Sequence, residues 1–109
     1  AYSYKDKMIN HALHWDGYGE HHQSSGKNEQ LDIYDGEFHT FALKWTKERY
    51  YFYVDGKLMW DTDDGGVSEV KTYLKLTLEV GSWAGEIDRS LLPSGIEVDY
   101  IRVYQFSTY

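Results

Sequence analysis

The 109-residue sequence contains no cysteine and a single proline. Without cysteine, neither a disulfide framework nor a thiolate-bound metal can form. Eleven basic residues stand against 18 acidic ones, and no segment gathers Lys and Arg into a stripe that would neutralise phosphates. The formal charge of −7 therefore argues against a nucleic acid partner and against an anionic membrane surface. No apolar run approaches the roughly 20 residues that a membrane-spanning helix needs.

Aromatic residues are abundant, with eleven Tyr, four Trp and four Phe. Flat and β-branched side chains pack well on a pleated sheet, so this composition favours strands. Helical periodicity is absent, and six stretches have the length and composition of strands: residues 8–15, 37–45, 49–55, 57–62, 73–80 and 96–105. Polar segments rich in Gly, Ser, Asp and Asn separate them and are predicted to be loops: residues 17–30, 61–71 and 81–95.

The clearest local signal is Asp55-Gly56, which lies between two apolar runs and predicts a two-residue hairpin turn with positive φ. Residues 75–80 alternate strictly, which places Thr77 and Glu79 on the face opposite the leucines. Six antiparallel strands joined by polar loops predict an all-β fold, a β-sandwich or jelly roll.

Paired carboxylates are the first catalytic pattern to seek, because a retaining glycosidase uses two of them about 5 Å apart. Two pairs of acidic residues are separated by a single residue: Glu86 with Asp88, and Glu97 with Asp99. Neither pair continues to a second glutamate at the required spacing. The first pair lies in a Gly-flanked loop, where solvent exposure explains it without catalysis.

Metal ligation is the next hypothesis, because the sequence has four histidines between residues 11 and 22. On a strand His11 and His14 point to opposite faces, and the adjacent His21 and His22 of the loop are more simply exposed. Residues 61–66 weakly resemble a calcium loop but lack acidic ligands at the spacing that such a loop needs. A polar loop after a strand is the better interpretation.

Trp83 is flanked by small residues in the last predicted loop. An exposed tryptophan on a groove lip and a structural plug under the loop explain it equally well, because tryptophan serves in both.

Four blocks taken together resemble glycoside hydrolase family 16, the family of laminarinases and mixed-linkage β-glucanases. They have the order and spacing of the family's "FHTYALEW…FYVDG…W.G…VDYVRVYQ" succession and span residues 38–45, 51–57, 74–85 and 98–105. The resemblance covers residues 8 to 105. It implies a concanavalin A-like jelly roll of two sheets, of which this chain, residues 1–109, is the C-terminal portion and about half of the sandwich.

The resemblance also implies a secreted retaining endo-β-glucanase that hydrolyses β-1,3 or mixed β-1,3/1,4 glucans. The family's catalytic strand carries Glu-x-Asp-x-(x)-Glu, and no such segment occurs in this chain. The catalytic carboxylates are therefore expected outside it, on a complementary N-terminal chain or in an exchanged homodimer. Catalysis needs no cofactor.

Substrate-binding residues follow from the same resemblance. Residues 8–15 resemble the strand beside the catalytic one, which nominates Asn10, Ala12 and His14 for the cleft. The strand before the tryptophan loop nominates Thr77 and Glu79, and Trp83 follows it. Some relatives carry Trp where Glu79 stands, so the substrate linkage stays open.

Asp99 matches an aspartate that helps to bind a structural calcium in many family members. Two further hypotheses remain beside the enzyme. The chain could be a lectin-like module that binds β-glucan through His14, Glu79 and Trp83 without cleaving it, or a structural β-domain with no sugar role.

Overall fold

The computed structural model describes residues 2–3, 7–17, 19–33, 35–77, 90 and 95–106. The chain divides into two compact units, residues 1–74 and residues 75–109. All the strands found in the described residues belong to the first unit.

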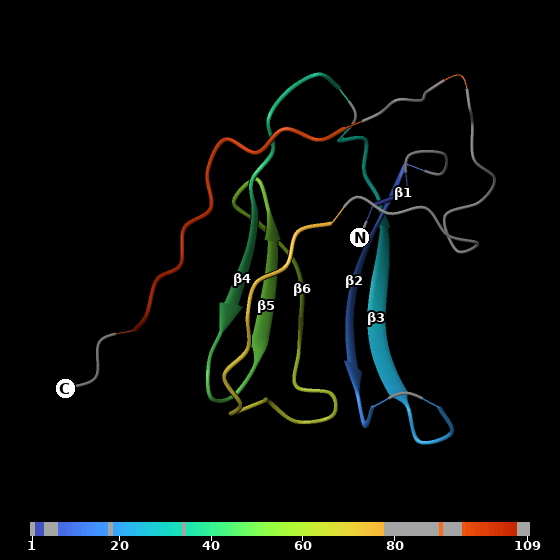
Figure 1. The fold of residues 1–109 in the computed structure, drawn as a ribbon, viewed down its shortest axis with the longest axis vertical. Helices are drawn as coiled ribbons and strands as arrows, with labels where there is room; N and C mark the ends of the chain where they lie inside the picture. Colours follow the sequence, from blue (N-terminus) through green and yellow to red (C-terminus); the bar gives the residue numbers. More distant parts are fainter. Residues whose placement is uncertain are drawn as a thin grey trace. The chain divides into compact units, whose positions relative to one another are not determined.

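The first sheet has the strand order β1-β2-β3 (Figure 1). It consists of β1 (Tyr2–Ser3), β2 (Met8–Trp15) and β3 (Gln23–Gln30). β2 and β3 are antiparallel and pair over their whole length, from Met8 opposite Gln30 to Trp15 opposite Gln23. Residues opposite each other in such a ladder project from the same face, so the register also defines the two faces of this sheet.

The second sheet has the order β4-β5-β6, with β4 (Phe41–Trp45), β5 (Tyr50–Val54) and β6 (Lys57–Thr62). The turn between β5 and β6 is Asp55-Gly56, with φ of 50° and 80°. Both residues are in the left-handed region, which confirms the predicted two-residue hairpin turn. An irregularity between Phe52 and Tyr53 shifts the register of the β5–β6 pair.

The buried core of the first unit lies between these sheets. Its most buried apolar side chains are Ile9 of β2 and Val54 of β5, each 3% exposed. The His11 ring of β2 is also buried and lies 5.3 Å from the Phe52 ring of β5, measured between centroids. The two sheets therefore face each other as the layers of a sandwich.

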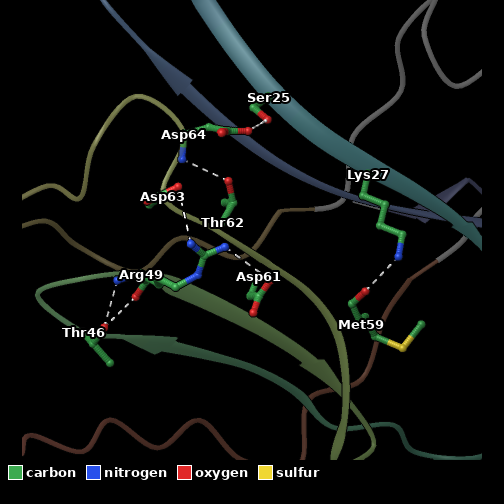
Figure 2. Close-up of polar contacts among 9 residues, drawn as sticks. All are labelled: Ser25, Lys27, Thr46, Arg49, Met59, Asp61, Thr62, Asp63 and Asp64. Atoms are coloured by element: carbon green, nitrogen blue, oxygen red, sulfur yellow. Dashed lines mark hydrogen bonds and ion pairs between the residues drawn. The ribbon is translucent and has the colours of Figure 1, made fainter.

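Two polar contacts join the sheets beside this core (Figure 2). Lys27 of β3 donates through Nζ to the carbonyl of Met59 in β6, at 3.3 Å. Ser25 of β3 donates through Oγ to Asp64 Oδ2, just after β6, at 2.6 Å. The face of β3 that carries Ser25 and Lys27 is therefore its inner face.

The prediction that residues 17–30 form a loop is wrong for its second half, since β3 occupies Gln23–Gln30. This strand is polar throughout, and its exposed positions outnumber the others. Composition did not reveal it because its stability comes from backbone pairing with β2 and not from an apolar stripe of its own.

Two other predicted strands differ from the structure. Residues 73–77 and 95–106 carry no strand, and residues 78–80 lie outside the described part of the chain. Alternation indicates only that a segment has an apolar face; a strand also needs a neighbour whose N–H and C=O groups pair with its own. In the second unit, Arg102 lies over the Tyr100 ring at 4.4 Å from its centroid.

Two antiparallel sheets and no α-helix in the described residues confirm the all-β sandwich class. Within those residues, no helix is long and apolar enough to cross a membrane.

Candidate functional site

The outer face of the β2–β3 pair carries the predicted cleft residues. Asn10, Ala12 and His14 alternate along β2 and project opposite to the buried His11. The register sets Asn28, Gly26 and Ser24 of β3 directly opposite them on the same face. The structure therefore brings Asn10 and His14 together on one polar surface, which we call the outer β2–β3 face.

One end of this face holds an amide pair. Asn10 donates through Nδ2 to Asn28 Oδ1 at 2.6 Å. The bond fixes both side chains in one orientation, and the Nδ2 group of Asn28 can donate to a hydroxyl group of a ligand. Such an arrangement suits the recognition of a polyhydroxylated ligand.

The other end holds two imidazoles. His14 Nδ1 and His22 Nε2 lie 2.9 Å apart, and the two rings stack with centroids 5.0 Å apart and planes 9° apart. Because this bond occupies Nδ1 of His14, its Nε2 is the nitrogen that can bind a ligand hydroxyl. The loop after β2 begins with Asp16, which accepts a hydrogen bond from Gln23 at 3.1 Å.

The centre of the face is flat because the opposed residues are Ala12 and Gly26. A Cβ added at Gly26 would stand 2.8 Å from the His11 carbonyl oxygen and 3.2 Å from Ala12 Cβ. Any larger residue at position 26 would crowd the ladder. The glycine therefore keeps an open strip between the amide pair and the imidazole pair.

No acidic residue lies on the outer β2–β3 face. Its eight ladder positions carry Met8, Asn10, Ala12, His14, Ser24, Gly26, Asn28 and Gln30. The one glutamate of β3, Glu29, projects from the inner face and forms an ion pair with Lys27 at 2.7 Å. This face can bind and orient a neutral ligand, but it lacks the two carboxylates that glycoside hydrolysis requires.

A second cluster centres on His39, just before β4. His39 Nδ1 lies 2.7 Å from Asp55 Oδ2, and His39 Nε2 lies 2.8 Å from Asp35 Oδ1. The hydrogen bonds to Asp55 and then to Asp35 raise the pKa of His39 to about 8. The backbone N–H of Thr40 also donates to Asp55, at 2.8 Å. Both ring nitrogens are engaged, so the cluster clamps the start of β4 to the hairpin turn.

Metal binding finds no support in the described residues, where no group of three or more His, Asp or Glu side chains converges. Arg49 lies 3.5 Å from both Asp61, near the end of β6, and Asp63, just after it (Figure 2), so these two carboxylates already have a cationic partner. Asp99 is exposed and lies in the second unit. The described residues alone do not form a calcium site, and the calcium prediction remains untested.

The remaining predicted site residues are not brought to the outer β2–β3 face. Thr77 is exposed and belongs to the second unit. Glu79 and Trp83 lie outside the described residues. Their roles therefore stay predictions.

Sequence reasoning missed Asn28, Gly26 and His22 as companions of Asn10 and His14. One signal was available, because Asp16-Gly17 repeats the Asp-Gly pair of the hairpin turn, and both residues have positive φ here as well. That signal marks a reversal of the chain after β2 and thus an antiparallel neighbour.

The family model described as "Glycosyl hydrolases family 16" matches residues 2–102. A β-glucanase from Fibrobacter succinogenes is 32% identical over 78 residues, which cover 67% of this chain and 22% of that protein. A β-glucanase from Rhodothermus marinus is 26% identical over 84 residues, covering 64% of this chain and 29% of that protein. The chain thus matches less than a third of either relative's length, and no solved structure gives a significant match.

Proposed function

Because the chain belongs to glycosyl hydrolase family 16, we propose that it forms part of a retaining endo-β-glucanase and provides a neutral wall of the glucan cleft. The observation that carries this proposal is the outer β2–β3 face, which presents hydrogen-bonded amides and imidazoles on a flat strip. The names of both curated relatives, which are β-glucanases, support a glucan as the ligand.

The catalytic carboxylates of the proposed enzyme lie outside this chain. The absence of a Glu-x-Asp-x-(x)-Glu segment supports this, as does the lack of acidic residues on the outer β2–β3 face. The expected substrates are β-1,3 glucans such as laminarin, or mixed β-1,3/1,4 glucans, and the expected location is extracellular. Thr77, Glu79 and Trp83 are proposed to contact the same chain of sugar rings.

The second candidate function is a lectin-like module that binds β-glucan without cleaving it. The neutral character of the outer face favours this candidate as much as it favours a supporting wall. Both proposals predict binding by the 109-residue chain and no turnover. They differ in whether a second polypeptide restores hydrolysis.

A direct test uses laminarin and barley β-glucan with the purified chain. Affinity electrophoresis should show retarded migration in gels that contain glucan, and an assay of reducing ends should show no hydrolysis. The His14→Ala variant should lose most of the retardation, because it removes both the imidazole and its stacked partner contact. Hydrolysis by the chain alone would refute both candidates.

His21→Ala is the matched control. His21 is an exposed histidine of the loop between β2 and β3 and does not lie on the ladder face. Its replacement should leave migration unchanged. Equal losses in the two variants would mean that the retardation depends on general charge and not on the outer face.

A complementary polypeptide is proposed as the partner. Phe41 and Leu43 stand opposite Val54 and Phe52 in the β4–β5 ladder, so they share the core-facing side of that sheet. Even so, they are 54% and 53% exposed. Apolar side chains in such a position invite a covering chain or an exchanged homodimer. A lone, well-folded monomer in size-exclusion chromatography with light scattering would contradict this proposal.

A further inference from the structure

The outer face of the β4–β5–β6 sheet carries two tyrosines at its centre. Side chains alternate along β5, and Tyr50 and Val54 are buried on the side that faces the other sheet. Tyr51 and Tyr53 therefore project from the opposite, outer side, where both are half-buried. Because β5 is the middle strand of this sheet, each tyrosine has a neighbour on both sides.

The pairing register defines these neighbours. Six side chains form two rows of three across the sheet: Ala42, Tyr53 and Leu58 in one row, and Lys44, Tyr51 and Asp61 in the other. We call this surface the tyrosine face. The rows are two residues apart along each strand, which is about 6.5 Å. The four residues beside the tyrosines are exposed, Leu58 at 46%, so the tyrosine face is open in the described part of the chain.

The irregularity in the β5–β6 pair places Leu58 on the tyrosine face. In a regular strand Leu58 and Trp60, two residues apart, would share one face. Here Trp60 pairs with Phe52 on the inner side, where the two rings stack with centroids 5.1 Å apart, whereas Leu58 pairs with Tyr53. Bulges of this kind re-aim a side chain and are common next to functional sites. This one adds an apolar side chain to the surface at the expense of the core.

The second row combines an aromatic ring with two opposite charges. Lys44 Nζ lies over the Tyr51 ring, 5.2 Å from its centroid, which is within the range of a cation–π interaction. On the other side of Tyr51, Asp61 has Arg49 as its cationic partner at 3.5 Å (Figure 2). Since Lys44 and Asp61 carry opposite charges, the tyrosine face as a whole favours neither an anion nor a cation.

The chemistry of the tyrosine face fits a neutral, polyhydroxylated ligand. Tyrosine offers a rigid apolar ring with a polar tip, so a sugar ring can pack on it while the sugar hydroxyl groups bond to Lys44 and Asp61. A nucleic acid would need a basic stripe, and a purely apolar ligand would desolvate both charges without compensation. With Leu58 as its one large aliphatic side chain, the face also lacks the apolar core of a typical protein interface.

The flatness of the tyrosine face determines how the ligand is presented. A flat surface contacts one side of a polysaccharide chain, so a single soluble chain gains few contacts. Neighbouring chains of an insoluble glucan can engage both rows at once, and their contributions to binding then combine.

We propose that the tyrosine face is a second carbohydrate-binding surface, which holds the chain on insoluble β-glucan. The identity of the ligand rests on the proposed function. The location does not, because the tyrosine face and the outer β2–β3 face are the outer sides of two facing sheets and lie on opposite sides of the sandwich. One chain can therefore attach to a glucan surface and still present the outer β2–β3 face to another glucan chain.

The test measures depletion of the purified 109-residue chain by curdlan, an insoluble β-1,3 glucan, together with affinity electrophoresis in soluble laminarin. Tyr51→Ala and Tyr53→Ala should each weaken binding to curdlan about tenfold, as expected for an aromatic side chain at the centre of a contact surface, and should keep the retardation in laminarin. His14→Ala should show the reverse. Tyr53→Phe keeps the ring and should bind curdlan like the original chain.

Tyr73→Ala is the matched control. It removes a tyrosine that is 81% exposed and lies outside the three strands, so binding to both glucans should be unchanged. Leu58→Glu adds a charge to the tyrosine face from an exposed position and should also weaken binding to curdlan. Thermal unfolding identifies any loss of fold, and Leu58→Glu carries the test if a tyrosine variant unfolds.

The outcomes separate the inference from the proposed function. If folded Tyr53→Ala and Leu58→Glu bind curdlan like the original chain, the inference is wrong, while a loss of retardation in His14→Ala still supports the proposed function. If these variants lose curdlan binding but laminarin does not retard the original chain, the inference stands and the proposed role of the outer β2–β3 face falls. If the original chain binds neither glucan, both fall.

A protein partner is the alternative occupant of the tyrosine face. Size-exclusion chromatography with light scattering tests this for a second copy of the chain. Self-association that is lost in Tyr53→Ala, with curdlan binding unchanged, would make the face a protein interface and overturn the inference.

Discussion

The β2–β3 and β5–β6 pairs are both antiparallel ladders, yet they are built from opposite sequences. In the β5–β6 pair, aromatic and branched residues flank an Asp-Gly turn, and the strands follow each other after two residues. In the β2–β3 pair, a mixed strand faces a polar one, and residues 16–22 connect them. The first pair is specified locally, whereas the second depends on β2 being anchored in the core. The polar pair is the one that carries the candidate site.

Substitutions in the buried core should cause the largest loss of stability and should test whether the two strand pairs unfold together. Ile9→Ala should lower the free energy of unfolding by about 2 to 4 kcal/mol, because Ile9 is 3% exposed and its removal leaves a cavity. Urea unfolding followed by tryptophan fluorescence measures the loss. Val54→Ala in the other sheet is the companion variant. If each variant unfolds in a single transition, the two strand pairs unfold together. If either variant unfolds in two transitions, the two strand pairs unfold separately.

Two glycine substitutions compare the ladders directly. Gly26→Ala should cost about 1 to 3 kcal/mol, because the new Cβ would meet the His11 carbonyl and Ala12. Gly56→Ala meets no atom within 4 Å, so it should cost only the strain of a positive φ, about 1 kcal/mol. Urea unfolding of the two variants measures both losses in the free energy of unfolding. The reverse order would mean that β3 shifts easily and that the flat strip is not tightly specified.

Substitution of His11 should change the free energy of unfolding by a smaller amount and in the opposite direction, towards higher stability. Its Nε2 is buried without a hydrogen-bond partner in the described structure, and burial lowers the pKa of the ring. His11→Phe should therefore raise the free energy of unfolding by about 1 kcal/mol, because it keeps a ring beside Phe52 and removes an unsatisfied polar atom. Chemical unfolding at pH 7 tests this. A loss of stability would mean that a polar partner satisfies the imidazole.

The contributions of His11 and His39 to the stability of the fold should depend on pH in opposite directions. The lowered pKa of His11 means that stability is present above pH 6.5 and is lost as the pH falls below it. The raised pKa of His39 means that its contribution is full below pH 6.5 and is lost as the pH rises through about 8.

His39→Asn should accordingly flatten the loss between pH 6.5 and 8.5, and His11→Phe should flatten the loss on the acid side. Both changes are expected to be modest, because Asp35 and Asp55 are 41% and 50% exposed and solvent screens the interaction. Urea midpoints measured from pH 5 to 9 give the profiles. An unchanged alkaline limb in His39→Asn would mean that the clamp does not hold in solution.

Several elements were predictable from the sequence. β2 and β6 have the predicted bounds, and the Asp55-Gly56 turn has the predicted conformation. β4 begins at Phe41 and not at residue 37, because the side chain of Asp55 takes the N–H of Thr40 and anchors the preceding residues to the turn. Local chemistry and alternation were sufficient wherever the strand had an apolar face of its own.

The candidate site was predictable only in part. Alternation along β2 correctly placed Asn10 and His14 on one face, and the family resemblance nominated them. Their partners Asn28 and His22 come from a segment whose polar composition indicated a loop. No local pattern distinguishes a polar strand from a polar loop when backbone pairing supplies the stabilisation.

The sequence by itself determined the all-β class, the family, the hairpin turn and the absence of a catalytic Glu-x-Asp-x-(x)-Glu segment. These properties depend on residue types at short spacings, which are visible along the chain. The tertiary structure decided which residues meet: it set β3 beside β2, buried His11 and paired His14 with His22. Such contacts join residues far apart in the sequence, and they form only when the two sheets pack on one core.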